Sequence, residues 1–341
     1  MNKNKRLFLM SAAVLLASAT TTAQADILGD VKNRGSLNCG VNVGLTGFSA
    51  PDSKGEWQGL DVEVCRGIAS AVLGDPEKVE FTPLTAKERF TALQSGEIDV
   101  LSRNTTWTAT RDNSLGLNFT ATTFYDGQGF MIAKDLGVDS LEQLDGASIC
   151  IQSGTTHELN LADYFPSRDI NIDTVTFDTP DQTVQGFASG RCDVLTSDTS
   201  QLSALRLQLP EPDSVKVLPT LISKEPLGPV VRQGDDKWFD IVKWSLFAML
   251  NAEEMGITQD NVDDMKSNPP NPGVARLLGV EGKYGEQLGL SNDWAYNIIK
   301  HVGNYGEVFA RTVGEDSRLK IERGLNALWT EGGIQYAPPV R

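Results

Sequence analysis

Hydrophobic and polar positions along the chain predict strands and helices in turn. The apolar run at 37–43 is typical of a buried strand, and Leu60, Val64 and Ile68 recur at helical spacing before Gly74. The same pattern predicts further strands at 79–83 and 98–102 and a helix at 86–94. Alternation of this kind favours an α/β architecture with a largely parallel sheet.

The alternation restarts in the middle of the chain. It predicts strands at 148–151, near Val175 and at 193–196, and helices at 155–164 and 182–189. The segment 94–102 is echoed by 188–196, and each reads as a helix end, a Gly stop and a buried strand. The echo and the restart together predict two lobes of similar construction. Beyond them, helices are expected at 236–251, 294–302 and 319–329.

The first 25 residues have the order of a secretory signal peptide. Lys3, Lys5 and Arg6 precede an apolar run at 7–17, and small residues up to Ala25 follow. This run is too short to cross a bilayer stably. We therefore expect residues 1–25 to be removed and the mature chain to be exported to the periplasm.

Composition narrows the function. The 341 residues carry 45 acidic against 30 basic side chains, a net charge of −15. This excess argues against nucleic-acid binding, which depends on Lys and Arg. The length fits two domains.

Four cysteines lie beyond the predicted signal peptide: Cys39, Cys65, Cys150 and Cys192. An oxidising compartment permits disulfides, and four cysteines allow three pairings, which the residues alone leave open. No two cysteines have the close spacing of a zinc site.

Two segments carry donors for an anion. The loop at 102–111 follows a predicted strand and offers hydroxyls, an amide and Arg111, whose guanidinium can bind a carboxylate through two parallel bonds. At 151–158 a strand, a Gly turn and a helix start follow one another, and the free amides of a helix N-terminus favour a small anion. A solvated surface loop and an ordinary helix cap are the respective alternatives.

A third segment carries a negative charge. Asp198 follows the strand at 193–196, where its carboxylate could hold an ammonium group or cap the next helix. Together the three segments are complementary to an amino-acid zwitterion.

At this point the chain resembles the periplasmic solute-binding proteins of polar and general L-amino-acid ABC transporters, the family 3 amino-acid binding proteins. The most specific segments are 102–108, 150–156, 190–193 and the closing stretch 303–339. The resemblance implies a type II periplasmic-binding-protein fold, with two α/β lobes, two hinge crossings and a helical C-terminal extension. It implies lobe 1 at 26–133 plus 225–341, and lobe 2 at 134–224.

The resemblance also implies a ligand site. The carboxylate-binding Arg of the family falls on Arg111, and the ammonium-binding Asp falls on Asp198. The remaining expected ligand-binding residues are Asn104, Thr106, Thr156 and Gln152, with Arg103 beside the site for acidic side chains. Leu45 and Ala86 stand where relatives place aromatic clamps, which favours a roomier and less selective pocket.

The implied lobes select one disulfide pairing. Cys39 with Cys65, and Cys150 with Cys192, would each stay within one lobe and leave hinge motion free.

The implied function is extracytoplasmic binding of free L-amino acids, including glutamate, glutamine and aspartate, and their delivery to an ABC importer. The partners would be the membrane permease subunits with their cytoplasmic ATPase, and the protein would be a monomer. His157 and His301 form no recognisable catalytic or metal-binding arrangement, so we predict no enzyme, cofactor or metal. A dehydratase-like periplasmic enzyme on the same fold is the alternative.

Overall fold

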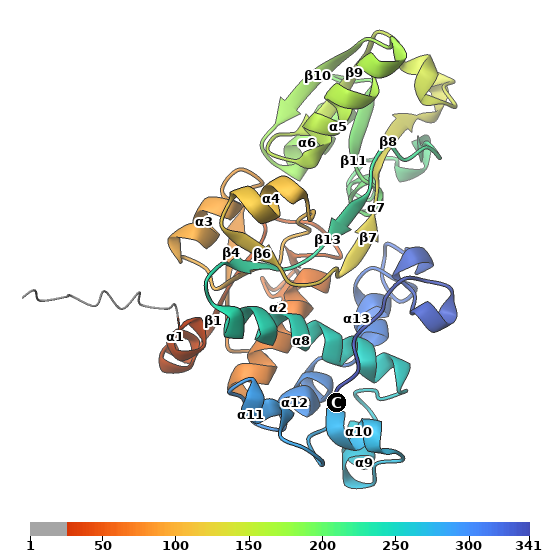
Figure 1. The fold of residues 1–341 in the computed structure, drawn as a ribbon. Coiled ribbons are helices and arrows are strands. Elements are labelled where there is room, and N and C mark those ends of the chain that lie inside the picture. Colours follow the sequence, from red (N-terminus) through yellow and green to blue (C-terminus); the bar gives the residue numbers. More distant parts are fainter. Residues whose placement is uncertain (1–25) are drawn as a thin grey trace, which may run out of the picture.

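The computed structural model describes residues 26–341, and the predicted signal peptide at 1–25 lies outside this part of the chain. Two five-stranded sheets with flanking helices form two lobes, which a pair of antiparallel strands connects (Figure 1). The predicted two-lobed α/β fold is therefore confirmed. Within residues 26–341, no helix is both long enough and apolar enough to cross a membrane.

The first lobe is built on a sheet of strand order β4-β1-β5-β14-β6, in which β1 runs parallel to β4 and β5. β14 enters from a distant part of the chain and pairs antiparallel with β5 and β6. Its elements are α1 (Ile27–Arg34), β1 (Leu37–Asn42), β2 (Ala50–Pro51), β3 (Trp57–Gln58), α2 (Leu60–Leu73), β4 (Val79–Leu84), α3 (Arg89–Ser95), β5 (Val100–Leu101), α4 (Ala109–Ser114), β6 (Leu117–Phe119) and β14 (Val230–Arg232).

The second lobe has the sheet order β10-β9-β11-β8-β12, with β9, β10 and β11 parallel. Its elements are β8 (Gln128–Ala133), β9 (Ala147–Gln152), α5 (Thr156–Tyr164), β10 (Ile172–Phe177), α6 (Pro180–Ala188), β11 (Val194–Asp198), α7 (Thr199–Arg206) and β12 (Val215–Val217). Because β8 pairs in this sheet, the expected lobe boundary after residue 133 falls too late. The sequence shows no composition break where the chain leaves the first lobe.

The internal echo in the sequence corresponds to equivalent structure. β5 and β11 each follow a Gly with positive φ, and each pairs parallel with the first strand of the parallel set in its sheet. Asp99 accepts a hydrogen bond from the amide of Asn38, and Asp193 accepts one from the amide of Ser148, both at 2.8 Å. The repeated Gly therefore precedes an equivalent strand in both lobes, and the repeated Asp accepts an equivalent backbone hydrogen bond in both lobes.

The hinge consists of β7 (Phe124–Asp126) and β13 (Glu225–Leu227), which pair antiparallel with Asp126 opposite Glu225. Glu225 is also the residue at which the sequence analysis places the return to lobe 1. The loop after β5 joins this hinge, because the amide of Trp107 donates to the carbonyl of Pro226 at 2.8 Å. The predicted ligand loop is thus attached to the strand that enters the first lobe.

The C-terminal region is helical and lies beneath the first lobe (Figure 1). It contains α8 (Asp236–Glu254), α9 (Val262–Ser267), α10 (Pro272–Leu277), α11 (Tyr284–Gln287), α12 (Trp294–His301) and α13 (Tyr305–Thr312). The predicted helix at 319–329 is wrong. Lys320 and Gly324 have φ values of 50° and 48°, which interrupt a helix, and the side chain of Asn326 bonds instead to the backbone of Tyr125 in the hinge.

Both predicted disulfides are confirmed. Cys39 on β1 is bonded to Cys65 on α2, with their Cα atoms 6.3 Å apart. Cys150 on β9 is bonded to Cys192 just before β11, with a Cα separation of 5.5 Å. Each bond closes a loop inside one lobe, so neither opposes a movement of the lobes about the hinge.

Candidate functional site

The first-lobe part of the site is the loop after β5. Asp61, in the first turn of α2, accepts hydrogen bonds from the amide of Asn104 at 2.8 Å and the hydroxyl of Ser102 at 3.3 Å. These bonds hold Asn104 at φ 32°, a conformation that Asn tolerates better than most residues. Burial raises the pKa of Asp61 to about 7, against the pull of these two bonds and of the Arg103 charge.

Arg111 is buried at the start of the short helix α4. The hydroxyl of Thr108 accepts a hydrogen bond from the Arg111 amide and so caps the helix, while the Arg111 guanidinium donates to the carbonyl of Thr106 at 2.9 Å. This bond uses one terminal nitrogen, Nη1, and within residues 26–341 the other terminal nitrogen makes no hydrogen bond. Burial lowers the pKa of Arg111 to about 10, and the charges of Glu225 and Asp198 oppose that shift. The two acids therefore lie close to this guanidinium.

The second-lobe part of the site begins at the N-terminus of α5. Thr155 occupies the N-cap position, but its side chain caps no amide of the helix and donates to the carbonyl of Gln152 instead. The Thr156 hydroxyl donates to Glu225 of the hinge at 2.8 Å. The first-turn amides of α5, rather than the Thr156 hydroxyl, are thus the natural donors for an anion at this helix end.

Asp198 ends β11 and stands before α7. Its carboxylate makes no capping bond to α7 and instead bonds to Nε2 of His157 at 2.9 Å, with both side chains buried. Burial alone would lower the pKa of His157, but the charge and hydrogen bond of Asp198, followed by the charge of Glu225, raise it. Of the two roles that the sequence left open for Asp198, helix capping is not the one the structure adopts.

The sequence analysis did not identify His157 or Glu225 as members of the site. His157, Asp198 and Glu225 each offer a ligand atom, and these atoms all lie within 4.8 Å of one another. Such a spacing also suits a metal ion, but the nearby guanidinium of Arg111 favours a monovalent ammonium group over a dication. The available signal was the position of His157 inside the predicted anion-binding segment 151–158, but the sequence analysis gave it no catalytic or metal-binding role.

Arg89 is a second residue that the sequence analysis missed. It is buried at the start of α3 and makes only long hydrogen bonds, to the Thr105 hydroxyl at 3.3 Å and to the carbonyl of Gly154 at 3.4 Å. Within residues 26–341, its Nε has no hydrogen-bond partner. Burial, followed by repulsion from Arg111 and Arg103, lowers the pKa of Arg89 well below its ordinary value.

Arg103 has a different environment from Arg89. Its Nε donates to the carbonyl of Leu84 at 2.9 Å, and the charge of Asp61 offsets part of the burial that lowers its pKa to about 10. Arg103 is therefore bonded within the first lobe. The charge of Asp198, from the second lobe, also raises its pKa. Within residues 26–341, no carboxylate of the first lobe raises the pKa of Arg89 in the way that Asp61 raises the pKa of Arg103.

The two lobes contact each other across the cleft. Asn104 donates to Gln201 of α7 at 3.4 Å, Arg89 reaches Gly154, and Lys87 forms an ion pair with Asp178 at 2.7 Å. Ala86, predicted to lie at the ligand, is buried beside Gly154. The lobes are closed on each other in this arrangement.

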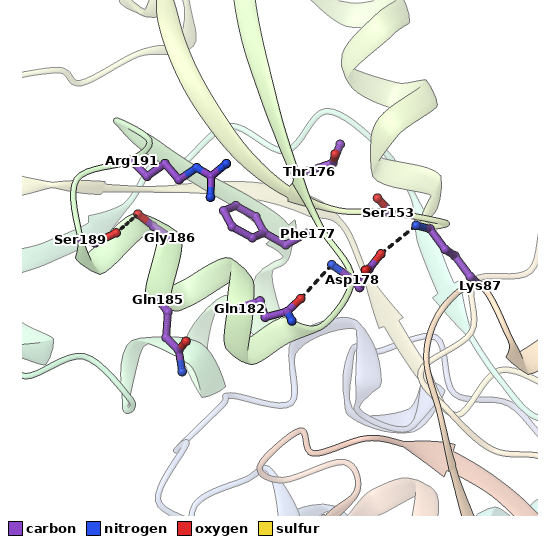
Figure 2. Close-up of a pocket in the computed structure, with 10 residues that line it drawn as sticks. All are labelled: Lys87, Ser153, Thr176, Phe177, Asp178, Gln182, Gln185, Gly186, Ser189 and Arg191. Carbon is purple, nitrogen blue, oxygen red and sulfur yellow. Dashed lines mark hydrogen bonds and ion pairs between the residues drawn. The ribbon is translucent and has the colours of Figure 1, made fainter.

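A groove of about 740 Å³ opens beside the cleft on the second lobe. Figure 2 shows Lys87 and Asp178 at one end of it, next to Ser153, and the guanidinium of Arg191 over the ring of Phe177 at the other. Gln152, predicted to touch the ligand, donates to the carbonyl of Asp178 at 3.0 Å. The loop at 152–154 therefore borders this groove through Ser153.

The geometry brings together positive charge from the first lobe and negative charge from the second lobe and the hinge. This is the polarity that a zwitterion requires, and residues 37–261 match the bacterial extracellular solute-binding proteins, family 3. The chain belongs to that family. The match spans both lobes and the hinge, whereas the helices after residue 261 lie outside it.

Similar proteins match over nearly the whole chain. It is 60% identical over 341 residues to the general L-amino acid-binding periplasmic protein AapJ of Rhizobium johnstonii, covering 99% of this chain and 100% of the relative. It is 51% identical over 337 residues to the glutamate/glutamine/aspartate/asparagine-binding protein BztA of Rhodobacter capsulatus, covering 99% and 100%. These matches include the C-terminal helices.

A solved structure has the same fold. An ABC transporter periplasmic binding protein from Brucella ovis with glutathione bound superposes with a TM-score of 0.91 and 57% sequence identity, covering 93% of this chain and all of that one. The predicted type II binding-protein fold is confirmed by this neighbour. The prediction of the family, which these comparisons confirm, rested on the segments 102–108, 150–156, 190–193 and 303–339.

Proposed function

We propose that this protein binds free L-amino acids in the cleft between its lobes and delivers them to an ABC importer. The observation that carries the proposal is the polarity of the cleft: Arg111 of the first lobe and the N-terminus of α5, which Thr155 does not cap, offer positive partners, and Asp198 offers a negative one. A ligand carboxylate would lie between Arg111 and the α5 amides, and its ammonium group would bind Asp198. Nearly every ligand charge would then be paired, as burial requires.

The predicted side-chain preference follows from the unpaired cations. Arg89 and Arg103 would supply positive charge for the second carboxylate of glutamate or aspartate, and amides would bind the same region through neutral hydrogen bonds. The naming of the Rhodobacter relative for glutamate, glutamine, aspartate and asparagine supports this range. The absence of aromatic side chains at Leu45 and Ala86 supports a pocket that tolerates several side chains.

The groove beside the cleft adds room for larger ligands. Glutathione carries a glutamyl zwitterion at one end, and the Brucella relative is described with glutathione bound. In this chain the glutamyl end would occupy the amino-acid site, and the remainder would extend past Ser153 into the groove of Figure 2. Competition between glutathione and glutamate in calorimetry tests this part, since simultaneous binding of both would contradict a shared site.

The proposal also includes the compartment in which the protein acts and the importer to which it delivers its ligand. The mature chain, after removal of residues 1–25, would be a periplasmic monomer that presents its closed, ligand-bound form to membrane permease subunits. Mass spectrometry of the exported protein tests the cleavage after Ala25. Light scattering of the same sample measures its oligomeric state.

Calorimetry on a panel of amino acids is the experiment that tests the proposed function. A single site with micromolar or tighter affinity corresponds to about −8 kcal/mol or better, which a small zwitterion can reach. We expect stoichiometric binding of glutamate and glutamine with no product detected by NMR after prolonged incubation. Release of a new product would favour the dehydratase-like enzyme, and no heat with any amino acid would refute the binding function.

A further inference from the structure

The residue at the N-cap position of α7 does not cap the helix. Asp is a preferred N-cap residue because its carboxylate normally accepts hydrogen bonds from the first amides of the helix. Asp198 occupies that position, but its side chain makes no such bond and lies against His157 instead. Another group must therefore satisfy the start of α7.

That group is Asp126, the last residue of the hinge strand β7. Its carboxylate accepts a hydrogen bond from the Thr199 hydroxyl at 2.5 Å and one from the Ser200 amide at 3.2 Å. It also accepts one from the amide of Gly127 at 2.8 Å. Asp126 thus performs from the hinge the capping function that the sequence would assign to Asp198.

The two carboxylates lie close enough to influence each other. Burial, followed by the charge of Asp198, raises the pKa of Asp126 to about 6, and the bonds to Ser200 and Thr199 oppose this rise. If Asp126 did not occupy the donors of α7, the carboxylate of Asp198 could reach the amides of the helix that it precedes. It would then turn away from His157 and from the cleft.

We propose that Asp126 is a positioning residue, which caps α7 from the hinge and thereby leaves the Asp198 carboxylate directed into the cleft. The inference rests on the proposed function in one respect, namely that Asp198 binds the ligand ammonium group. The capping exchange itself concerns only residues of this chain.

The opposite hinge strand makes a related contact. Glu225 faces Asp126 in the β7–β13 pair, and its carboxylate accepts from Thr156 and Asn160 of α5, both at 2.8 Å. Each hinge strand therefore has an acid at its second-lobe end, the last residue of β7 and the first of β13, and that acid binds a second-lobe helix. Asp126, unlike Glu225, binds Thr199, the residue next to Asp198. The proposal is therefore tested by substituting Asp126.

The first experiment follows the His157 imidazole by NMR in protein without added ligand, in the wild type and in Asp126→Ala. In Asp126→Ala, Asp198 is free to cap α7, so we expect the pKa of His157 to fall below its wild-type value. His301, exposed on α12, supplies a second imidazole signal as an internal reference. Asp126→Asn retains an oxygen that can accept the Thr199 and Ser200 bonds, so its His157 pKa should stay above that of Asp126→Ala.

The second experiment measures glutamate binding to the same variants. Asp126→Ala should raise the Kd at least about tenfold, whereas Asp126→Asn should stay within about threefold of the wild type. Asp235→Ala is a matched control, because Asp235 is also a buried capping aspartate, at the start of α8 and on the far side of the first lobe. It should leave both the His157 pKa and the Kd unchanged.

An unchanged His157 pKa in Asp126→Ala would overturn the proposal, and so would equal weakening of glutamate binding in the Ala and Asn variants. Thr199→Val removes one of the two bonds to α7 and keeps Asp126, which gives a milder test if Asp126→Ala does not fold. A smaller fall in the His157 pKa would support the proposal, and no fall would contradict it. Because the NMR titration needs no ligand, failure of glutamate to bind would count against the proposed function and not against the capping exchange.

Discussion

The two sides of the cleft differ in the sign of their buried charge. The first lobe contributes three guanidiniums, from Arg89, Arg103 and Arg111, and one nearby acid, Asp61. The second lobe and the hinge contribute the buried carboxylates of Asp198 and Glu225 and the half-buried carboxylate of Asp126, and His157 is bonded to Asp198. The net charge of −15 therefore does not predict the charge of either side of the cleft, because a few groups in the cleft determine the charge of each side.

The difference also shows how each face is stabilised. The second-lobe acids are held by hydroxyls, amides and His157, so their negative charge is well paired before any ligand is considered. The first-lobe cations are poorly paired, and burial lowers the pKa of each. A ligand with more than one anionic group would offset the most unpaired charge in the first lobe, so we expect the cationic face to contribute most of the affinity for such a ligand.

The largest expected effect is the loss of binding in Arg111→Ala. Without the guanidinium, the ligand carboxylate would be buried with only the α5 amides as donors. Leaving a buried charge without its partner typically costs about 3–5 kcal/mol, so we expect the Kd for glutamate to rise roughly a thousandfold. Calorimetry measures this change, and Arg206→Ala on the exposed side of α7 is the control. Near-normal binding would remove Arg111 from the site.

The second prediction concerns Asp61, the acid of the cationic face. Its folded pKa of about 7 lies above the unfolded value near 3.8, so the folded state retains the proton to higher pH. Stability from this group is therefore present below pH 4 and is lost as the pH rises toward 7, by roughly 4 kcal/mol in total. Urea unfolding across this range should show a smaller decline in Asp61→Asn than in the wild type.

Asp213→Asn is the control for that measurement, because this exposed aspartate has no comparable burial. Identical pH profiles for the wild type and Asp61→Asn would mean that Asp61 ionises normally. The cationic face would then contain a permanent negative charge, and its contrast with the second lobe would be smaller than we infer.

The third prediction separates the two remaining arginines. Arg89→Met removes a cation that has only long hydrogen bonds, so we expect the Kd for glutamate to rise about thirtyfold and the Kd for glutamine only a few-fold. Arg103→Met removes the other cation proposed for the second carboxylate, but this guanidinium is also bound to Leu84 and close to Asp61, so the variant should lower the free energy of unfolding as well as weaken glutamate binding. Equal losses for glutamate and glutamine in Arg89→Met would show that Arg89 does not discriminate acidic ligands.

The sequence was sufficient for the fold and for the residues at strand ends. Alternating patterns predicted both lobes, and the loop at 102–111 follows β5 while Asp198 ends β11, so both predicted segments lie at carboxyl ends of strands. Arg89 was missed because its importance comes from burial beside two other arginines, which helical spacing does not reveal. Asp126 and Glu225 were missed because only the register of the hinge strands places them opposite each other.

The failed helix prediction has the same physical origin. Apolar spacing at 319–329 is compatible with a helix, but the contacts of this segment are distant in sequence. Arg323 pairs with Glu253 of α8 at 2.9 Å, and Asn326 binds the hinge. Such tertiary contacts outweigh a local preference that differs by only fractions of a kcal/mol per residue.

The smallest predicted effect concerns the ion pair at the mouth of the cleft. Lys87 and Asp178 come from opposite lobes, and their side chains are 57% and 64% exposed. The bond to Asp178 raises the pKa of Lys87, so the pair is charged at neutral pH, but salt screens exposed pairs effectively. We therefore expect Lys87→Ala to weaken glutamate binding only about twofold at low salt, with the difference vanishing near 0.5 M salt. A large, salt-independent loss would instead place Lys87 in contact with the ligand, and the cationic face would extend to the rim of the cleft.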